Sequence, residues 1–290
     1  MSSAEFAQIA VNAILLSGIL ALVALGFSLV WGIMNIVNLA HGAYVVLGAY
    51  FTFYLNELAG IDPFVSIPLS MLALFSLGFV IQKTLINQVV RAPLLATFLL
   101  TFGLEILIVN LVNFFFKADL RSVTTRYSGS GWTLGAVRVP YIRLAALGIS
   151  MVLVLIAAWF LRSTRAGRAI RATGMDIDAA RLTGVKVATI YSLTYAIGAS
   201  LAGAAGSLLS MIVPFDPNFG GGYTQRAFVI SVLGGLGEVA NVVFGALLYA
   251  FVDVFVGVRL PALSQAFTFA ALVLLLVLRP QGIAGKKFYA

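Results

Sequence analysis

Residues 6–56 read FAQIAVNAILLSGILALVALGFSLVWGIMNIVNLAHGAYVVLGAYFTFYLN, and this run contains no aspartate, glutamate, lysine or arginine. A helix needs about 20 apolar residues to cross the hydrocarbon core of a bilayer. The run is therefore long enough for two crossings, with the turn between them near residues 31–42. The composition agrees, because 61% of the 290 residues are hydrophobic and only 10% are charged. The sequence thus predicts an integral membrane protein with several spans.

Further apolar runs follow along the chain and predict six more spans. They lie at residues 64–82, 92–116, 144–161, 187–215, 239–258 and 260–278. The run at 227–237 is too short to cross a bilayer of about 30 Å, which predicts a short or broken helix there. We therefore expect an all-α integral membrane protein with about eight transmembrane helices plus this short helix. A faint similarity between residues 42–49 and 227–235 favours a build from two weakly similar halves.

The residue types exclude several classes of site. The chain has no cysteine and one histidine, so it has no disulfides or thiolate metal sites and little material for a metal centre. It also lacks a Gly-x-x-x-x-Gly-Lys-Ser/Thr phosphate loop and a Gly-x-Ser-x-Gly nucleophile elbow. We therefore expect no enzyme activity, no ATP hydrolysis, no cofactor and no metal. The net charge of +8 indicates loop charge that orients a membrane protein, not nucleic-acid binding.

Residues 162–186, RSTRAGRAIRATGMDIDAARLTGVK, form a polar segment with its own helix signals. Arginines recur every three residues from Arg162 to Arg171, which predicts a cationic stripe on a continuing helix that Gly174 ends. Asp176 suits the N-cap of a second, short helix, and Gly184 suits the position just past its end. The segment is either a basic loop that fixes membrane orientation or a small helix that docks on another protein.

A few polar side chains lie inside apolar runs. Asn35, Asn38 and His41 fall in the turn of the first long run, and lipid cannot satisfy their hydrogen bonds. They either line a passage or form structural hydrogen bonds between helices. Glu105 near the middle of the run 92–116 is either a buried hydrogen-bonding group or a proton relay, and Asp253 lies in a similar position in a later run.

These motifs resemble those of the branched-chain amino acid ABC transporter permeases. The run from Ala24 to Tyr44, with its Asn-Leu-Ala-His-Gly core, is similar to the N-terminal signature of that family. The Asp178-Ala-Ala-x-x-x-Gly184 order resembles the EAA loop of ABC importer permeases, with aspartate where glutamate is usual and without the proline part of the fuller motif. The turn ending at Glu238 and the closing Leu-Arg-Pro-Gln-Gly-Ile at 278–283 also match.

The resemblance implies one transmembrane permease domain over residues 1–290 with a cytoplasmic coupling loop at 162–186. The expected partners are a second related permease, two cytoplasmic ATP-binding subunits, an extracytoplasmic substrate-binding protein and membrane lipid. The expected cargo is leucine, isoleucine or valine. The residues expected to couple to the ATPase are Asp178, Ala179, Ala180 and Gly184 as the docking surface, with Arg168 and Arg171 orienting it. The residues expected along the translocation pathway are Asn35, Asn38, His41 and Glu105.

The resemblance and the distribution of cations also predict where the protein lies and how it is oriented. The family implies a bacterial or archaeal inner membrane, and eleven of the 18 Lys and Arg residues fall on the side of the coupling loop. That bias puts the N-terminus outside and the C-terminus in the cytoplasm. The alternatives are an ABC permease for urea or short amides, and an ion-coupled secondary transporter that uses Glu105 and Asp253 as protonation sites.

Overall fold

The computed structural model describes residues 2–90, 92–235 and 239–278. The end of the expected short helix at 236–237, Glu238, and the chain end with its closing motif lie outside these residues. Six helices are long and apolar enough to cross a membrane, which confirms the all-α membrane fold. They are α1 (Ser3–Met34), α3 (Pro63–Ile81) with its continuation to Val89, α5 (Leu94–Phe116), α6 (Tyr141–Ser163), α9 (Val187–Ser210) and α11 (Val239–Arg259). The shorter helices are α2 (His41–Ala59), α10 (Gly220–Gly234) and α12 (Ser264–Leu278), which follows the 3₁₀ turn Pro261–Leu263.

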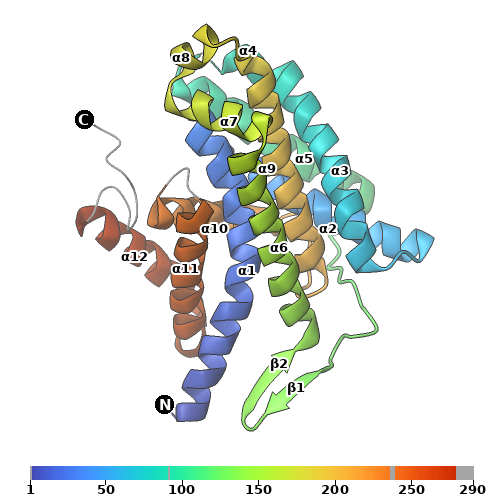
Figure 1. The fold of residues 1–290 in the computed structure, drawn as a ribbon. Coiled ribbons are helices and arrows are strands. Elements are labelled where there is room, and N and C mark those ends of the chain that lie inside the picture. The colour runs from blue at the N-terminus through green and yellow to red at the C-terminus, as the bar shows by residue number, and fades with distance from the viewer. Residues whose placement is uncertain (1, 91, 236–238, 279–290) are drawn as a thin grey trace.

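Helices α1 and α9 form the buried centre of the molecule (Figure 1). They approach closely at Gly26 and Gly198, where a Cβ on Gly198 would lie 2.8 Å from the carbonyl oxygen of Gly26. Further along α9, Gly206 packs directly against the carbonyl group of Val45 in α2. The small-residue face of the run 187–215 is therefore a packing surface, as its four-residue spacing predicts.

Two helices begin inside the bundle. After α1, residues 35–40 turn back, so that His41 at the start of α2 lies beside Val23, about 16 Å before the end of α1. Helix α10 crosses α1 between Ala24 and Trp31. The first residues of α2 and α10 touch, because a Cβ on Gly42 or Gly220 would overlap the backbone carbonyl of the other.

Several boundaries differ from the sequence expectation. The expected short helix at 227–237 begins earlier, at Gly220, because the glycines at 220–222 allow it to start against α2. The third span does not end at Gln82 but continues as a π-turn over Gln82–Ile86 and a helical turn over Asn87–Val89. The side chain of Gln82 is buried there and donates to Asn87, five residues on, at 3.0 Å.

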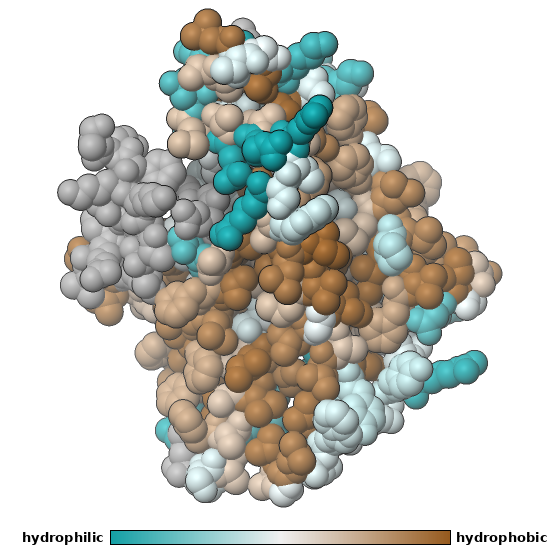
Figure 2. All heavy atoms as spheres, viewed as in Figure 1, coloured by the Kyte–Doolittle hydropathy of each residue, from teal (hydrophilic) through white to brown (hydrophobic). Residues whose placement is uncertain are grey.

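The two ends of the bundle differ in structure. At one end the segment between α5 and α6 contains a β-hairpin of β1 (Gly131–Leu134) and β2 (Val137–Pro140), which lies beside the N-terminus through Gln8 (Figure 1). At the other end lie α7 (Arg165–Met175) and α8 (Ile177–Leu182). Figure 2 shows hydrophilic residues at these two ends and a hydrophobic band between them. This is the surface of a protein that spans a bilayer.

Candidate functional site

The segment 162–186 folds as two short helices, and the expected continuous arginine stripe is wrong. Thr164 has an extended backbone, with φ −88° and ψ 159°, and separates α6 from α7. Its hydroxyl group caps α7 by accepting from the amide of Gly167 at 2.9 Å. The helix therefore breaks at Thr164, and Gly174 lies inside α7, one residue before its end. Spacing alone could not reveal this break, because threonine also occurs within helices.

Two of the arginines hold α7 against the end of α6. The guanidinium group of Arg168 donates to the carbonyl oxygen of Ser163 at 2.9 Å, and that of Arg171 donates to the carbonyl oxygen of Arg162 at 3.4 Å. The last carbonyl groups of a helix lack intrahelical partners and attract cations. These contacts fix the angle between the membrane helix and α7. Ile170, fully buried, adds an apolar anchor on the opposite side.

Helix α8 carries the caps that its sequence predicts. The carboxylate of Asp176 accepts from the amides of Asp178 and Ala179 at 2.9 and 3.0 Å. Gly184 has φ +84°, and the amide of Val185 closes the helix end on the carbonyl oxygen of Ala180 at 3.1 Å. This backbone conformation suits glycine, since a Cβ strains the left-handed region. The two caps therefore define α8 as a short helix of six residues, which we call the knob.

The outer surface of this knob combines exposed apolar side chains with the charged pair of Asp178 and Arg181. Ala180 is buried against the body, whereas Asp178 and Ala179 face outwards. Two large apolar side chains, Met175 and Leu182, are 88% and 91% exposed. Exposed apolar side chains at a polar end of the bundle are available for contact with another protein. Neither residue was predicted as a site residue, because the sequence does not distinguish them from other apolar residues of the segment such as Ile177.

A groove of about 670 Å³ lies behind α8. It is lined by Asn35 from the end of α1, Asn87 and Gln88 from the end of the third helix, and Asp178 and Arg181 from α8. Asp178 also pairs with Arg181 at 3.1 Å. The structure therefore places Asn35 next to the coupling helix, apart from Asn38 and His41.

Asn38 and His41 lie in the buried centre and bind to their own chain. The oxygen Oδ1 of Asn38 accepts from the hydroxyl of Tyr195 at 3.2 Å, and that hydroxyl lies 3.1 Å from the hydroxyl of Tyr44. The Nε2 atom of His41 lies 2.9 Å from the carbonyl oxygen of Val23. Both side chains thus hold the turn between α1 and α2 in place.

The two intramembrane carboxylates have different surroundings. Asp253 accepts a short hydrogen bond from Ser264 at the α11–α12 turn. Glu105, half-buried on α5, has no Lys or Arg nitrogen within 4 Å among the residues that the structure describes. Its side chain lies beside the start of α10, where a Cβ on Gly221 would be 3.7 Å from the Oε1 atom of Glu105.

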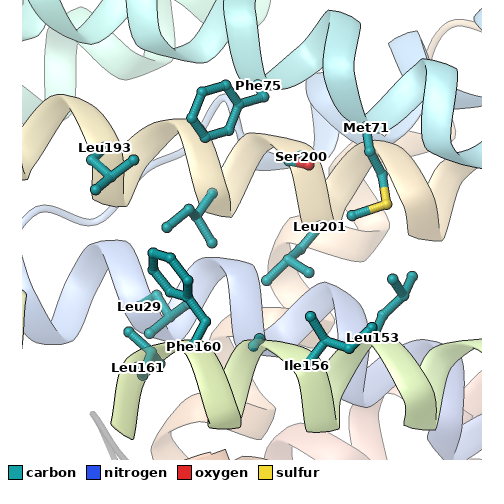
Figure 3. A pocket seen from close by; sticks show the side chains of 12 residues that line it. Leu29, Met71, Phe75, Leu153, Ile156, Phe160, Leu161, Leu193, Ser200 and Leu201 are labelled. Carbon is teal, nitrogen blue, oxygen red and sulfur yellow. The ribbon is translucent and has the colours of Figure 1, made fainter. Parts of the chain in front are cut away.

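An apolar hollow among the spanning helices lacks charged groups. It measures about 290 Å³ and is lined by residues of α1, α3, α6 and α9 (Figure 3). Its lining is apolar apart from Ser200, with Met71, Phe75 and Phe160 among the larger side chains. A hollow of this kind suits lipid chains and offers no partner for the charges of a polar solute.

Comparisons with known proteins agree with this architecture. The family described as "Branched-chain amino acid transport system / permease component" matches residues 9–277. The chain is 28% identical to the high-affinity branched-chain amino acid transport system permease protein BraD of Pseudomonas aeruginosa, over 97% of this chain and 96% of that protein. It is 26% identical to the corresponding protein LivH of Escherichia coli K12, over the same shares.

A partial match reaches a different named system. The autoinducer 2 import system permease protein LsrC of Yersinia pseudotuberculosis is 34% identical over 173 residues, which cover 56% of this chain and 44% of that protein. No solved structure matches the chain. The family match spans almost the whole sequence, from the start of α1 to the end of α12. The chain belongs to the family of branched-chain amino acid transport permease components.

Proposed function

We propose that this chain is a translocation subunit of an ATP-driven importer for leucine, isoleucine or valine. The full-length similarity to BraD and LivH supports this cargo. The observation that carries the mechanism is the capped knob of α8, which exposes Leu182 and Met175 at a polar end of the bundle. The proposed partners are a second related permease, two cytoplasmic ATP-binding subunits and an extracytoplasmic substrate-binding protein. The proposed location is a bacterial or archaeal inner membrane, with the N-terminus outside and the C-terminus in the cytoplasm.

The coupling works through a rigid contact. Asp178, Ala179 and Leu182 lie on the surface that meets the ATPase, and Ala180 and Gly184 shape it. Arg168 and Arg171 transmit its movement to α6 through their bonds to the carbonyl groups there. A shift from a 1:99 to a 99:1 ratio of two transporter states needs about 5.5 kcal/mol of differential binding, which a docked helix can supply.

The proposed pathway runs past Glu105. Asn38 and His41 support it from behind by holding the turn that starts α2, and Asn35 contributes to the groove behind α8. ATP would be hydrolysed by the partner subunits, because this chain carries no phosphate loop.

The test changes the exposed apolar tip of the knob. Leu182→Glu places a charge where an apolar contact is proposed, so we expect the ATP-binding subunits to co-purify at least tenfold less and ATP-driven leucine uptake to stop. Leu58→Glu is the matched control, because Leu58 is 80% exposed at the opposite end of the bundle. We expect that variant to behave like the wild type. Equal co-purification and uptake for both variants would contradict the assignment of α8.

One alternative rests on the intramembrane carboxylates. In a secondary transporter, Glu105 and Asp253 would carry protons, and the chain alone would move substrate. Reconstitution of the chain alone in liposomes distinguishes the two functions. Uptake driven by a proton or sodium gradient without ATPase subunits favours the alternative, whereas strict dependence on those subunits and ATP favours the importer.

A further inference from the structure

Helix α5 is unusual among the spanning helices because it packs mainly against the short helix α2 within the described chain. Most of its circumference is exposed, and many of the exposed side chains are large and apolar, as lipid contact requires. Three polar residues interrupt this surface. The half-buried Glu105 lies in the middle of the helix, and Asn110 and Asn113 lie nearer its end. The amide of the exposed Asn110 donates back to Ile106 at 2.8 Å.

Two exposed amide side chains lie on helices near α5. Gln225 of α10 and Gln265 of α12 bind each other at 2.6 Å. A small apolar hollow lies between these helices and α5, since Phe98 of α5 lines it together with Gln225 and Phe269 of α12. Lipid cannot satisfy the carboxylate of Glu105, so this carboxylate meets water or polar protein groups in the working assembly. The exposed residues in the middle of α6, such as Leu155, are apolar by contrast.

Glu105 is the charged centre of this face. An ionised carboxylate in the middle of a spanning helix is unfavourable unless it is compensated. Among the described residues no Lys or Arg nitrogen lies within 4 Å of it. The start of α10 lies beside it, where a Cβ on Gly221 would lie 3.7 Å from the Oε1 atom of Glu105. The carboxylate therefore has no cationic partner among the described residues of its own chain.

The chemistry of the carboxylate selects a complementary group. An ammonium group supplies three donors and a positive charge, and charge-assisted bonds to a carboxylate are roughly twice as strong as neutral ones. Free amino acids carry such a group at neutral pH, whatever their side chain. Urea and simple amides do not.

We propose that Glu105 binds the ammonium group of the amino acid during its passage, and that the face of α5 and α10 around it lines the water-filled path. This inference rests on the proposed function of the chain as an amino acid permease. In this inference Glu105 recognises the ammonium group that all free amino acids share. Other groups along the path would distinguish the side chains of the transported amino acids.

The first experiment measures access to water. The chain has no cysteine, so Glu105→Cys introduces its only thiol. In the assembled transporter in proteoliposomes, a membrane-impermeant, positively charged methanethiosulfonate should label this position. Leu155→Cys is the matched control, since Leu155 is exposed in the middle of α6 and should remain unlabelled. Absence of labelling at position 105 overturns the inference.

The second experiment measures transport. Glu105→Gln keeps the size of the side chain and removes its charge, so the leucine uptake rate at saturating loaded binding protein should fall about tenfold, or 1.4 kcal/mol. Glu105→Asp should recover part of the rate, and assembly and the thermal midpoint should stay unchanged in both variants. A merely structural role would instead lower the midpoint.

The outcomes separate this inference from the proposed function. If the wild-type assembly shows no ATP-dependent leucine uptake, the proposed function fails. If the wild type transports leucine and Glu105→Gln transports it equally fast, only the ammonium site fails.

Discussion

Gly184 shows at the scale of one residue how backbone conformation ends a helix. Its φ of +84° ends α8, and a Cβ there would meet no neighbouring atom. A substitution therefore acts through backbone strain of about 1–2 kcal/mol and not through a clash. We predict that Gly184→Val leaves the amount of protein in the membrane unchanged and lowers ATP-driven uptake at least tenfold, measured with radiolabelled leucine in whole cells.

Two controls isolate this strain. Gly184→Asn should keep most of the uptake, because asparagine tolerates the left-handed region. Gly60 has the same kind of conformation, with φ +63° and open space around it, at the end of α2. Gly60→Val should therefore transport normally. If Gly184→Val also transports normally, the end of α8 has no part in coupling.

Local signals at the residue scale were predictable from the sequence where a few neighbouring residues determine the outcome. Asp176 and Gly184 cap α8 as expected, because each cap depends on atoms within four positions. The arginine stripe failed because Thr164 takes an extended conformation, which local spacing does not encode. The placement of Asn35 beside α8 depends on contacts between distant segments and could not be read from the chain.

At the scale of elements, glycine decides which helices can meet. A Cβ on Gly206 of α9 would fall on the carbonyl oxygen of Val45 in α2, and the helices would have to separate. We predict that Gly206→Leu lowers the thermal midpoint of the detergent-purified protein sharply, since overpacking costs about 1–3 kcal/mol or more. Gly148→Leu on α6 is the control, because its Cβ would meet no atom within 4 Å. Equal midpoints for the two variants would contradict the close approach of α2 and α9.

The lengths of most helices followed from the apolar runs, whereas their paths did not. Hydropathy predicts where a span can lie because each residue adds its own cost of transfer. Residues 35–40 turn back and bring His41 beside Val23. This path depends on packing between α1, α2 and α10, which are distant in the sequence. The earlier start of α10 has the same origin, in the contact between Gly42 and Gly220.

At the scale of the whole molecule, the polar segments of the chain lie at two opposite ends of the helix bundle. The hairpin and the first residues of α1 form one end, and α7 and α8 form the other (Figure 1). Between them, the buried pair α1 and α9 is in direct contact with α2, α3, α6 and α7, so a push on α7 reaches the helices that surround the centre. This arrangement requires the two ends to lie on opposite sides of the membrane.

That requirement gives a prediction about sidedness. Because the chain contains no cysteine, Ser3→Cys and Ala179→Cys each provide one exposed thiol, at the first residue of α1 and on α8. In right-side-out membrane vesicles, an impermeant maleimide should label position 3 at once and position 179 only after the membrane is opened with detergent. In inside-out vesicles the order should reverse. If position 179 is labelled from outside, α8 cannot meet a cytoplasmic ATPase. Equal labelling of both positions from one side would show that an even number of crossings separates them, which contradicts the proposed sidedness.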